Sequence, residues 1–144
     1  MSATRSRKEH ITYRNHLASR KDSSCEFCKI TKKSKQHVYE GKYFKVIRNI
    51  FAYSLWDGQS VDHHLMLVPK KHVDSLKDLP DAAAVEYVRL VSKYEQEGYN
   101  IYARASVSVI KSIVHQHTHL VKTSGAPKKF LFLLRKPYLR IIYK

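Results

Sequence analysis

The chain has 144 residues, a length typical of one domain, and its 43% hydrophobic composition suffices for a single core. No apolar run approaches the roughly 18 residues of a membrane helix, and residues 1–21 lack the apolar centre of a secretory signal, so we expect a cytoplasmic protein without membrane contact. The formal net charge of +15 favours phosphate-bearing partners, although a basic surface that only serves solubility fits it equally well.

Residues 1–24 are predicted to form a basic N-terminal arm. Lysines and arginines are interspersed there with Ser, Thr and His, large apolar residues are few, and one short helix is expected around His10 to Arg20. A phosphate-binding tail and a solvated terminus both fit this composition, which favours the solvated terminus.

Cys25 and Cys28 form a C-x-x-C pair, and the chain has no other cysteine. Such a pair is a redox couple, half of a metal site, or two buried thiols. A redox couple favours a helix that starts at the second cysteine, whereas a lysine-rich turn over residues 29–35 follows here. Zinc needs four ligands, so histidines would have to complete a metal site.

The next segments are predicted to be strands. His37–Glu40 and Tyr43–Ile47 should form a hairpin, and residues 54–60 should form a polar loop. An apolar strand then follows His64 and leads into Pro69-Lys70-Lys71-His72.

A helix is predicted after this strand. Asp78 is a candidate N-cap, Pro80 fits an early helical position, and Gly98 is a fitting stop. A mainly apolar stripe is expected to pack on the sheet, and it consists of Ala84, Val88, Val91 and Glu95, with Val85 and Tyr94 alongside.

Two more strands are expected, over residues 100–105 and 107–121. His115, His117 and His119 alternate along the second, and alternate residues of a strand share one face. In an unbroken strand Ser112 would face away from His117, so a turn or bulge between residues 109 and 114 would be needed to bring the two together.

This spacing resembles the signature of the histidine-triad (HIT) superfamily. Cys-x-x-Cys followed by a hairpin, the Asn49–Tyr53 stretch and the Pro-Lys-x-His block resemble its zinc-bearing branch, and in particular its diadenosine polyphosphate hydrolases and phosphorylases. The resemblance covers roughly residues 25–121. It implies an enzyme that transfers or hydrolyses a nucleotidyl group at its α-phosphate.

The resemblance also implies a role for each site residue. His117 would be the nucleophile that forms a covalent nucleotidyl intermediate, and His119 would bond to phosphate or leaving-group oxygens. Ser112 would donate to phosphate oxygens, and His64 would play a secondary part in the active site. The two implied substrate-binding residues are Asn49, at the sugar or phosphate, and Lys111, which stands where the family has a Gly-Gln pair.

The zinc ligands implied by the resemblance are Cys25, Cys28, His72 and His115. His63 and His64 are rival candidates for the fourth position. Four protein ligands leave no open coordination position, so such a zinc ion would be structural and would tie the N-terminal part of the chain to the histidine strand.

The sequence therefore predicts an α+β fold, with an antiparallel sheet of about five strands and one main helix packed on it. Three regions are expected: the arm (1–24), a HIT-like domain (25–123) and a basic, aromatic C-terminal extension (124–144). The extension should add an edge strand around residues 130–134, and a homodimer through the sheet edge or this tail is possible. The alternatives are a zinc-stapled module that binds RNA or DNA without catalysis and, less favoured, a C-x-x-C redox protein.

Overall fold

Antiparallel strands of the central chain form one sheet. The computed structural model describes residues 4–19, 24–109, 111–127, 131–133 and 140–142. The six strands of the sheet are β1 (His37–Glu40), β2 (Phe44–Arg48), β3 (Leu55–Trp56), β4 (Gln59–Pro69), β5 (Asn100–Ala103) and β6 (Thr118–Pro127). Their order is β1-β2-β4-β6-β5, and β3 pairs with β4. The predicted α+β class and antiparallel sheet are confirmed.

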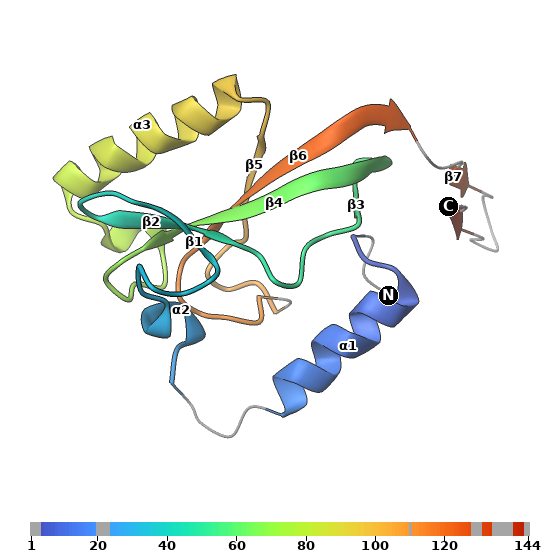
Figure 1. Cartoon of the computed structure of the whole chain (residues 1–144), viewed down its shortest axis with the longest axis horizontal. Helices are drawn as coiled ribbons and strands as arrows, with labels where there is room; N and C mark the ends of the chain where they lie inside the picture. The colour runs from blue at the N-terminus through green and yellow to red at the C-terminus, as the bar shows by residue number, and fades with distance from the viewer. Residues whose placement is uncertain (1–3, 20–23, 110, 128–130, 134–139, 143–144) are drawn as a thin grey trace.

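Helices lie on both sides of this sheet (Figure 1). The helices are α1 (Arg7–Ala18), the short α2 (Glu26–Lys29) and α3 (Asp81–Gln96), and a 3-10 turn spans Leu76–Asp78. α3 covers one face, whereas α1 and α2 lie on the other side, together with the chain that enters β6 (Figure 1). Among the described helices, none is both long and apolar enough to span a lipid bilayer.

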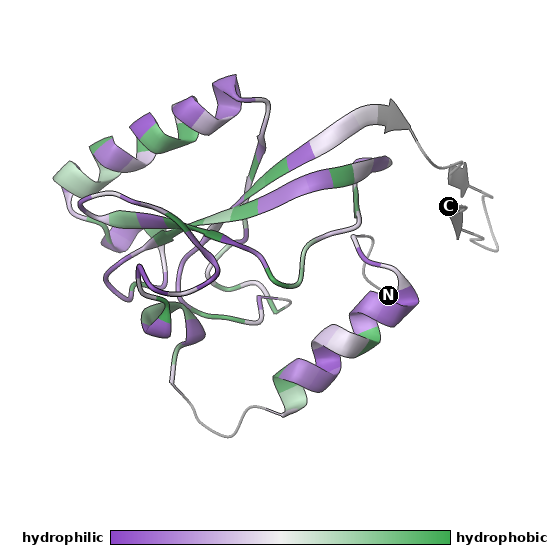
Figure 2. Cartoon of the chain, in the orientation of Figure 1, coloured by the Kyte–Doolittle hydropathy of each residue, from purple (hydrophilic) through white to green (hydrophobic). Residues whose placement is uncertain are grey.

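Successive side chains of β4 point to opposite faces of the sheet, and each face carries its own hydrophobic core. Leu65 and Leu67 belong to the cluster under α3, whereas Met66 and Val68 belong to the cluster that includes Phe27 of α2. Each large apolar side chain buried in this way contributes roughly 1.5–3 kcal/mol. Figure 2 shows hydrophobic colour in β2, in the part of β4 beside it and on the sheet-facing side of α3, while the rest of β4 and most of α1 are hydrophilic.

α3 uses a different stripe from the predicted one. Val85 and Val88 are 50% and 60% exposed, and the residues buried against the sheet are Ala83, Leu90 and Tyr94. The large tyrosine and leucine side chains fill the space above β2 and β6, so the helix is rotated by about one residue relative to the valine stripe. The helix also begins later than predicted, with Pro80 at its N-cap, and Asp78 ends the preceding 3-10 turn.

β6 begins at Thr118, so the strand predicted over residues 107–121 is confirmed only over its last four residues, and His115 and His117 precede it. His115 and Gln116 bond instead to the chain that leaves β4: Gln116 N donates to Val73 O at 2.7 Å, and His115 Nε2 lies 3.0 Å from Pro69 O. These long-range bonds hold the segment away from the sheet. The expected change of direction before His117 is a turn and not a bulge: Lys111 N donates to Ser108 O at 2.9 Å, Ser112 precedes the strand, and both Ser112 and His117 line the same cleft.

The expected polar loop over residues 54–60 is a hairpin. Leu55 pairs with Ser60 and Trp56 with Gln59. The two turn residues, Asp57 and Gly58, have φ of 48° and 74°. A two-residue turn with both φ values positive matches the twist of paired strands, which favours Asp-Gly at these positions.

The N-terminal segment packs on the domain, contrary to the solvated terminus that its composition favours. The predicted helix is present as α1, and Ser6 and Glu9 form a capping box at its start. Thr4 O accepts bonds from Ser54 N (3.0 Å) and Leu55 N (3.3 Å). The rings of Tyr13 and His16 lie 5.2 and 4.7 Å from that of Phe51. Few of these contacts are apolar, which is why composition did not reveal them.

The C-terminal extension is described only in part. The edge strand expected around residues 130–134 is described at β7 (Leu131–Leu133), which pairs with β8 (Arg140–Ile142) in a separate two-stranded sheet and does not join the main one. Residues 130 and 134 lie outside the described part of the chain.

Candidate active site and metal centre

A cleft of about 290 Å³ opens between α1, α2, the loop after β2 and the segment that enters β6. The predicted site residues that line it are Asn49, Lys111, Ser112, His117 and His119. His64 lies behind this wall, and the four predicted metal ligands form a separate cluster. The structure thus brings together residues from four distant parts of the sequence.

Hydrogen bonding fixes the tautomer of His115, which is fully buried. Its Nε2 lies 3.0 Å from Pro69 O, and because a carbonyl only accepts, Nε2 carries the proton. Nδ1 therefore has a free lone pair, which points to the sulfurs of Cys25 (3.3 Å) and Cys28 (3.5 Å). Burial lowers the pKa of His115 to about 4, so the ring is neutral at pH 7 and suited to binding a metal.

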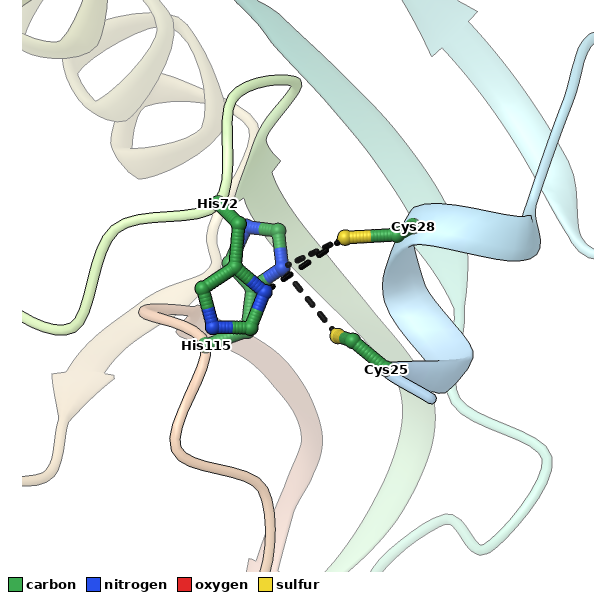
Figure 3. A group of neighbouring side chains, drawn as sticks. All are labelled: Cys25, Cys28, His72 and His115. Carbon is green, nitrogen blue, oxygen red and sulfur yellow. Dashed lines mark hydrogen bonds between the residues drawn. The ribbon is translucent and has the colours of Figure 1, made fainter. Parts of the chain in front are cut away.

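The Cys25, Cys28, His72 and His115 side chains converge on one point (Figure 3). Their ligand atoms all lie within 4.8 Å of one another, and His72 Nδ1 is 3.5 Å from Cys28 Sγ. In tetrahedral zinc sites, metal–sulfur and metal–nitrogen distances of about 2.3 and 2.0 Å place nitrogen and sulfur ligands about 3.5 Å apart. Two thiols and two imidazoles at these separations fit a tetrahedral zinc ion. The rival candidates lie elsewhere: His63 is exposed and His64 bonds to His119.

Lys45 supports this cluster, a role that the sequence analysis missed. Its side chain is buried, and Nζ donates to the carbonyls of Phe27 (2.7 Å) and Ile30 (2.6 Å) at the end of α2. It thereby joins the C-x-x-C turn to β2. The sequence did carry a signal for this role. Lys45 is two residues before Ile47 in a predicted strand, so the two side chains share one face, and a lysine on an apolar face needs buried hydrogen-bond partners.

His117 has the opposite tautomer from His115. Its Nδ1 lies 2.8 Å from the carbonyl oxygen of His115, so Nδ1 carries the proton and Nε2 keeps its lone pair. The ring lines the cleft, and burial lowers the pKa of His117, which leaves the imidazole neutral at pH 7. A neutral ring with a free Nε2 is the form that attacks an electrophile.

His119 is oriented by a short chain of donors. Tyr53 N donates to His64 Nδ1 at 2.9 Å, so the proton of neutral His64 is on Nε2. His64 Nε2 then donates to His119 Nδ1 at 2.9 Å, which leaves the His119 proton on Nε2. Burial lowers the pKa of His64 to about 3 and that of His119 well below its ordinary value, so both rings stay neutral. His119 therefore offers an N–H donor beside the nucleophile.

The other predicted residues also make contacts within the protein. Ser112 Oγ contacts the hydroxyl of Tyr13, and Lys111 Nζ donates to Asp74 O and Gln116 Oε1, both at 3.1 Å. Asn49 Oδ1 accepts from Phe51 N at 2.9 Å, the turn-capping role that is the alternative to substrate binding. All three side chains nevertheless line the cleft.

The charge around the cleft is strongly positive. Its cationic lining residues are Arg5, Lys29, Arg48, Arg104 and Lys111. Glu26 is the only carboxylate among the described lining residues, and it pairs with His16 at 3.1 Å. Such a surface attracts anions. Arg5, Tyr13 and His16 come from the N-terminal arm, and the sequence carried no signal that would place them here.

Comparison with known proteins agrees with this geometry. A family model described as the HIT domain matches residues 31–125, and the chain belongs to this family. Among curated proteins, it is similar to adenosine 5'-monophosphoramidase HNT1 of Candida albicans, with 30% identity over 120 residues, 74% of this chain and 72% of that protein. It is also 29% identical over 105 residues to the Saccharomyces cerevisiae HNT1 protein, which covers 69% of this chain.

The chain spans 63% of the length of the Saccharomyces cerevisiae relative. Among solved structures, it is similar in fold to a zinc-bound histidine triad family protein from Mycobacterium smegmatis. The TM-score is 0.54 at 23% identity, and the match covers 73% of this chain and 78% of the other. At this identity the likeness supports the shared fold.

Proposed function

We propose that this protein is a HIT-type nucleotide hydrolase or transferase that works through a covalent nucleotidyl-His117 intermediate. The observation that carries the proposal is the state of His117: its Nδ1 donates to His115 O at 2.8 Å, while Nε2 keeps its lone pair on the wall of a cationic cleft. The curated relatives are named adenosine 5'-monophosphoramidases, which supports a nucleoside phosphoramidate or a related adenylated compound as substrate.

The residues supply two successive displacements. His117 Nε2 attacks the α-phosphorus, the Nε2–P bond forms, and the bond from phosphorus to the leaving group breaks as that group gains a proton. Water then attacks the same phosphorus, releases the nucleoside monophosphate and restores the free imidazole. The His119 Nε2–H donor and the Ser112 hydroxyl would bond to the phosphate oxygens where negative charge grows.

We also propose that Cys25, Cys28, His72 and His115 hold a structural zinc ion. Two thiolates and two imidazoles fill its four positions, so it would supply rigidity without activating water. The support is the 3.3–3.5 Å spacing of sulfur and nitrogen atoms and the similarity in fold to a zinc-bound relative. Because His115 also provides the carbonyl that holds His117, the metal centre would keep the nucleophile in its tautomer.

Intact-protein mass spectrometry tests the mechanism. The protein is incubated with adenosine 5'-phosphoramidate or diadenosine triphosphate and quenched briefly without acid. We expect a mass increase of one nucleotide, absent in His117→Ala and present in His63→Ala, since His63 is an exposed histidine outside the cleft. Wild-type protein that turns over neither compound and forms no adduct would defeat the proposal and leave the nucleic-acid-binding alternative.

A further inference from the structure

The N-terminal segment contributes side chains to the cleft although it lies outside the region that the family model matches, residues 31–125. Residues 4–18 run from the β3 region along the side of the sheet that carries the cleft (Figure 1). Arg5 of this segment is partly buried and lines the cleft, and its Nη2 donates to Phe51 O at 2.7 Å. The region that the family model matches therefore does not form the whole cleft.

Arg5 is held in a defined position. Its guanidinium lies 4.5 Å from the ring centre of Tyr13 and 4.8 Å from that of Tyr53. The Nε atom is buried and has no hydrogen-bond partner among the described residues, and none of the described ion pairs involves this side chain. Glu9 acts on Arg5 electrostatically, but its carboxylate accepts bonds from Ser6 N and Ser54 Oγ.

A second guanidinium approaches the same place. Arg104 acts electrostatically on both Arg5 and Tyr53, and its guanidinium lies 5.3 Å from the ring centre of Tyr102. Two like charges beside one tyrosine repel each other, and an anion between or beside them would relieve that repulsion. The Tyr53 ring lies 5.3 Å from that of His119, so both cations stand at the His119 end of the cleft.

We infer that Arg5 binds the phosphate groups of the leaving group, so that the N-terminal segment selects substrates whose leaving group is itself a phosphate ester or polyphosphate. The inference rests on the proposed function and adds to it that the leaving group lies at the His119 end of the cleft. A small dinucleotide fits better than a nucleic acid, because Arg5, Tyr13 and His16 of the N-terminal segment line a cleft of only about 290 Å³. A substrate with an uncharged amine leaving group would gain nothing from Arg5.

The experiment compares two leaving groups on the same adenylyl group. Steady-state kcat/KM is measured with diadenosine triphosphate, which releases ADP, and with adenosine 5'-phosphoramidate, which releases ammonia. The variants are Arg5→Gln, Arg5→Lys and the matched control Arg7→Gln, which removes the same charge from an exposed position on α1. Melting temperatures of all variants are recorded.

A charge-assisted bond to phosphate predicts a tenfold to hundredfold loss, in order of magnitude, for the dinucleotide in Arg5→Gln. The phosphoramidate should change by less than about threefold, since it lacks the anion that the lost charge would bind. Arg5→Lys should restore part of the dinucleotide activity, and Arg7→Gln should change neither substrate. Equal losses on both substrates would show that Arg5 only anchors α1, and no loss on either would also overturn the inference. A loss confined to a 5'-adenylated oligonucleotide, with the dinucleotide unaffected, would overturn the small-molecule assignment.

Failure of the proposed function is recognisable separately. If the wild-type protein turns over neither compound, calorimetry with a non-hydrolysable diadenosine triphosphate analogue and with AMP decides the question. Tighter binding of the dinucleotide, lost in Arg5→Gln but kept in Arg7→Gln, would support Arg5 as a phosphate ligand. Equal affinities for the two compounds would contradict it.

Discussion

His64 and His119 form a directed pair, in which His64 Nε2 donates to His119 Nδ1 across 2.9 Å. The direction is set because Tyr53 N already donates to the other nitrogen of His64. Both residues are buried, each with 6% of its surface exposed. A proton added to either ring would break this arrangement and place an unpaired charge in the core, which is the physical reason for their lowered pKa values.

This pair predicts that stability falls in acid. His64 has a pKa of about 3 in the folded protein and an ordinary value of 6.5, so between these pH values the unfolded chain binds more protons. The contribution of neutral His64 to the free energy of unfolding is complete above pH 6.5. It is lost as the pH falls towards 3, by at most about 1.4 kcal/mol per pH unit. Urea unfolding between pH 7 and 5, with excess zinc, should give a shallower slope for His64→Gln than for the wild type. Identical dependence of the unfolding free energy on pH in the two proteins would contradict the lowered pKa of His64.

Metal removal should affect both stability and the nucleophile. In Cys28→Ser we expect zinc content to fall well below one ion per chain, and the free energy of unfolding to drop by at least about 2 kcal/mol. Activity should fall as well, because His115 holds the Nδ1 proton of His117. Cobalt substitution is a second measurement: the absorption spectrum should be that of a tetrahedral site with two sulfur ligands, and activity should persist. A cobalt form that folds but is inactive would argue against a purely structural metal.

Lys45→Met should destabilise the protein through α2. The variant removes both Nζ donors and leaves the carbonyls of Phe27 and Ile30 without their bonds, at a cost of about 2–4 kcal/mol. Lys35→Met, at an exposed position, removes the same charge and serves as the control. Chemical denaturation measures the stability, and competition with a chelator should show weaker zinc retention in Lys45→Met alone. Equal stability of the two variants would rule out the bracing role.

Glu86→Ala should weaken the fold without touching the chemistry. The Glu86 carboxylate on α3 accepts bonds from Tyr43 N (3.1 Å) and Phe44 N (3.3 Å), so it fastens the helix to the β1–β2 hairpin. Its loss should cost about 1–3 kcal/mol of unfolding free energy, because the two N–H groups lose a charged acceptor. Glu95→Ala, at an exposed site of the same helix, should be nearly neutral. Since α3 lies on the other face from the cleft, kcat should stay unchanged in both variants.

Much of the site was predictable because its motifs are local. Cys25 with Cys28, the Pro-Lys-x-His block and the alternating histidines are short patterns, and the structure brings all four predicted metal ligands together. The hairpin turn at Asp57-Gly58 was also readable from its residues, since Asp-Gly is a strong two-residue turn signal. It was missed because the flanking strand β3 is only two residues long.

The features that the sequence did not predict depend on long-range contacts. The start of β6 depends on bonds from His115 and Gln116 to a loop more than 40 residues earlier, which no local pattern reveals. The packing of α1 depends on polar and aromatic contacts with Phe51 and Ser54 rather than on an apolar stripe. The face of α3 was misjudged in part: Tyr94 and Val91 pack in the core as predicted, whereas Val85 and Val88 are exposed and Ala83 and Leu90 are buried instead.

The span of the cysteine and histidine cluster has a consequence for synthesis. Cys25 and His115 are 90 positions apart, and the ribosome makes the N-terminal thiols long before the last imidazole. A nascent chain therefore carries two sulfurs whose partners have not yet been made, and the cluster can close only once His115 has emerged. The carbonyl that aligns His117 belongs to His115, so the nucleophile is aligned only after the whole span from Cys25 to His115 has been made and folded.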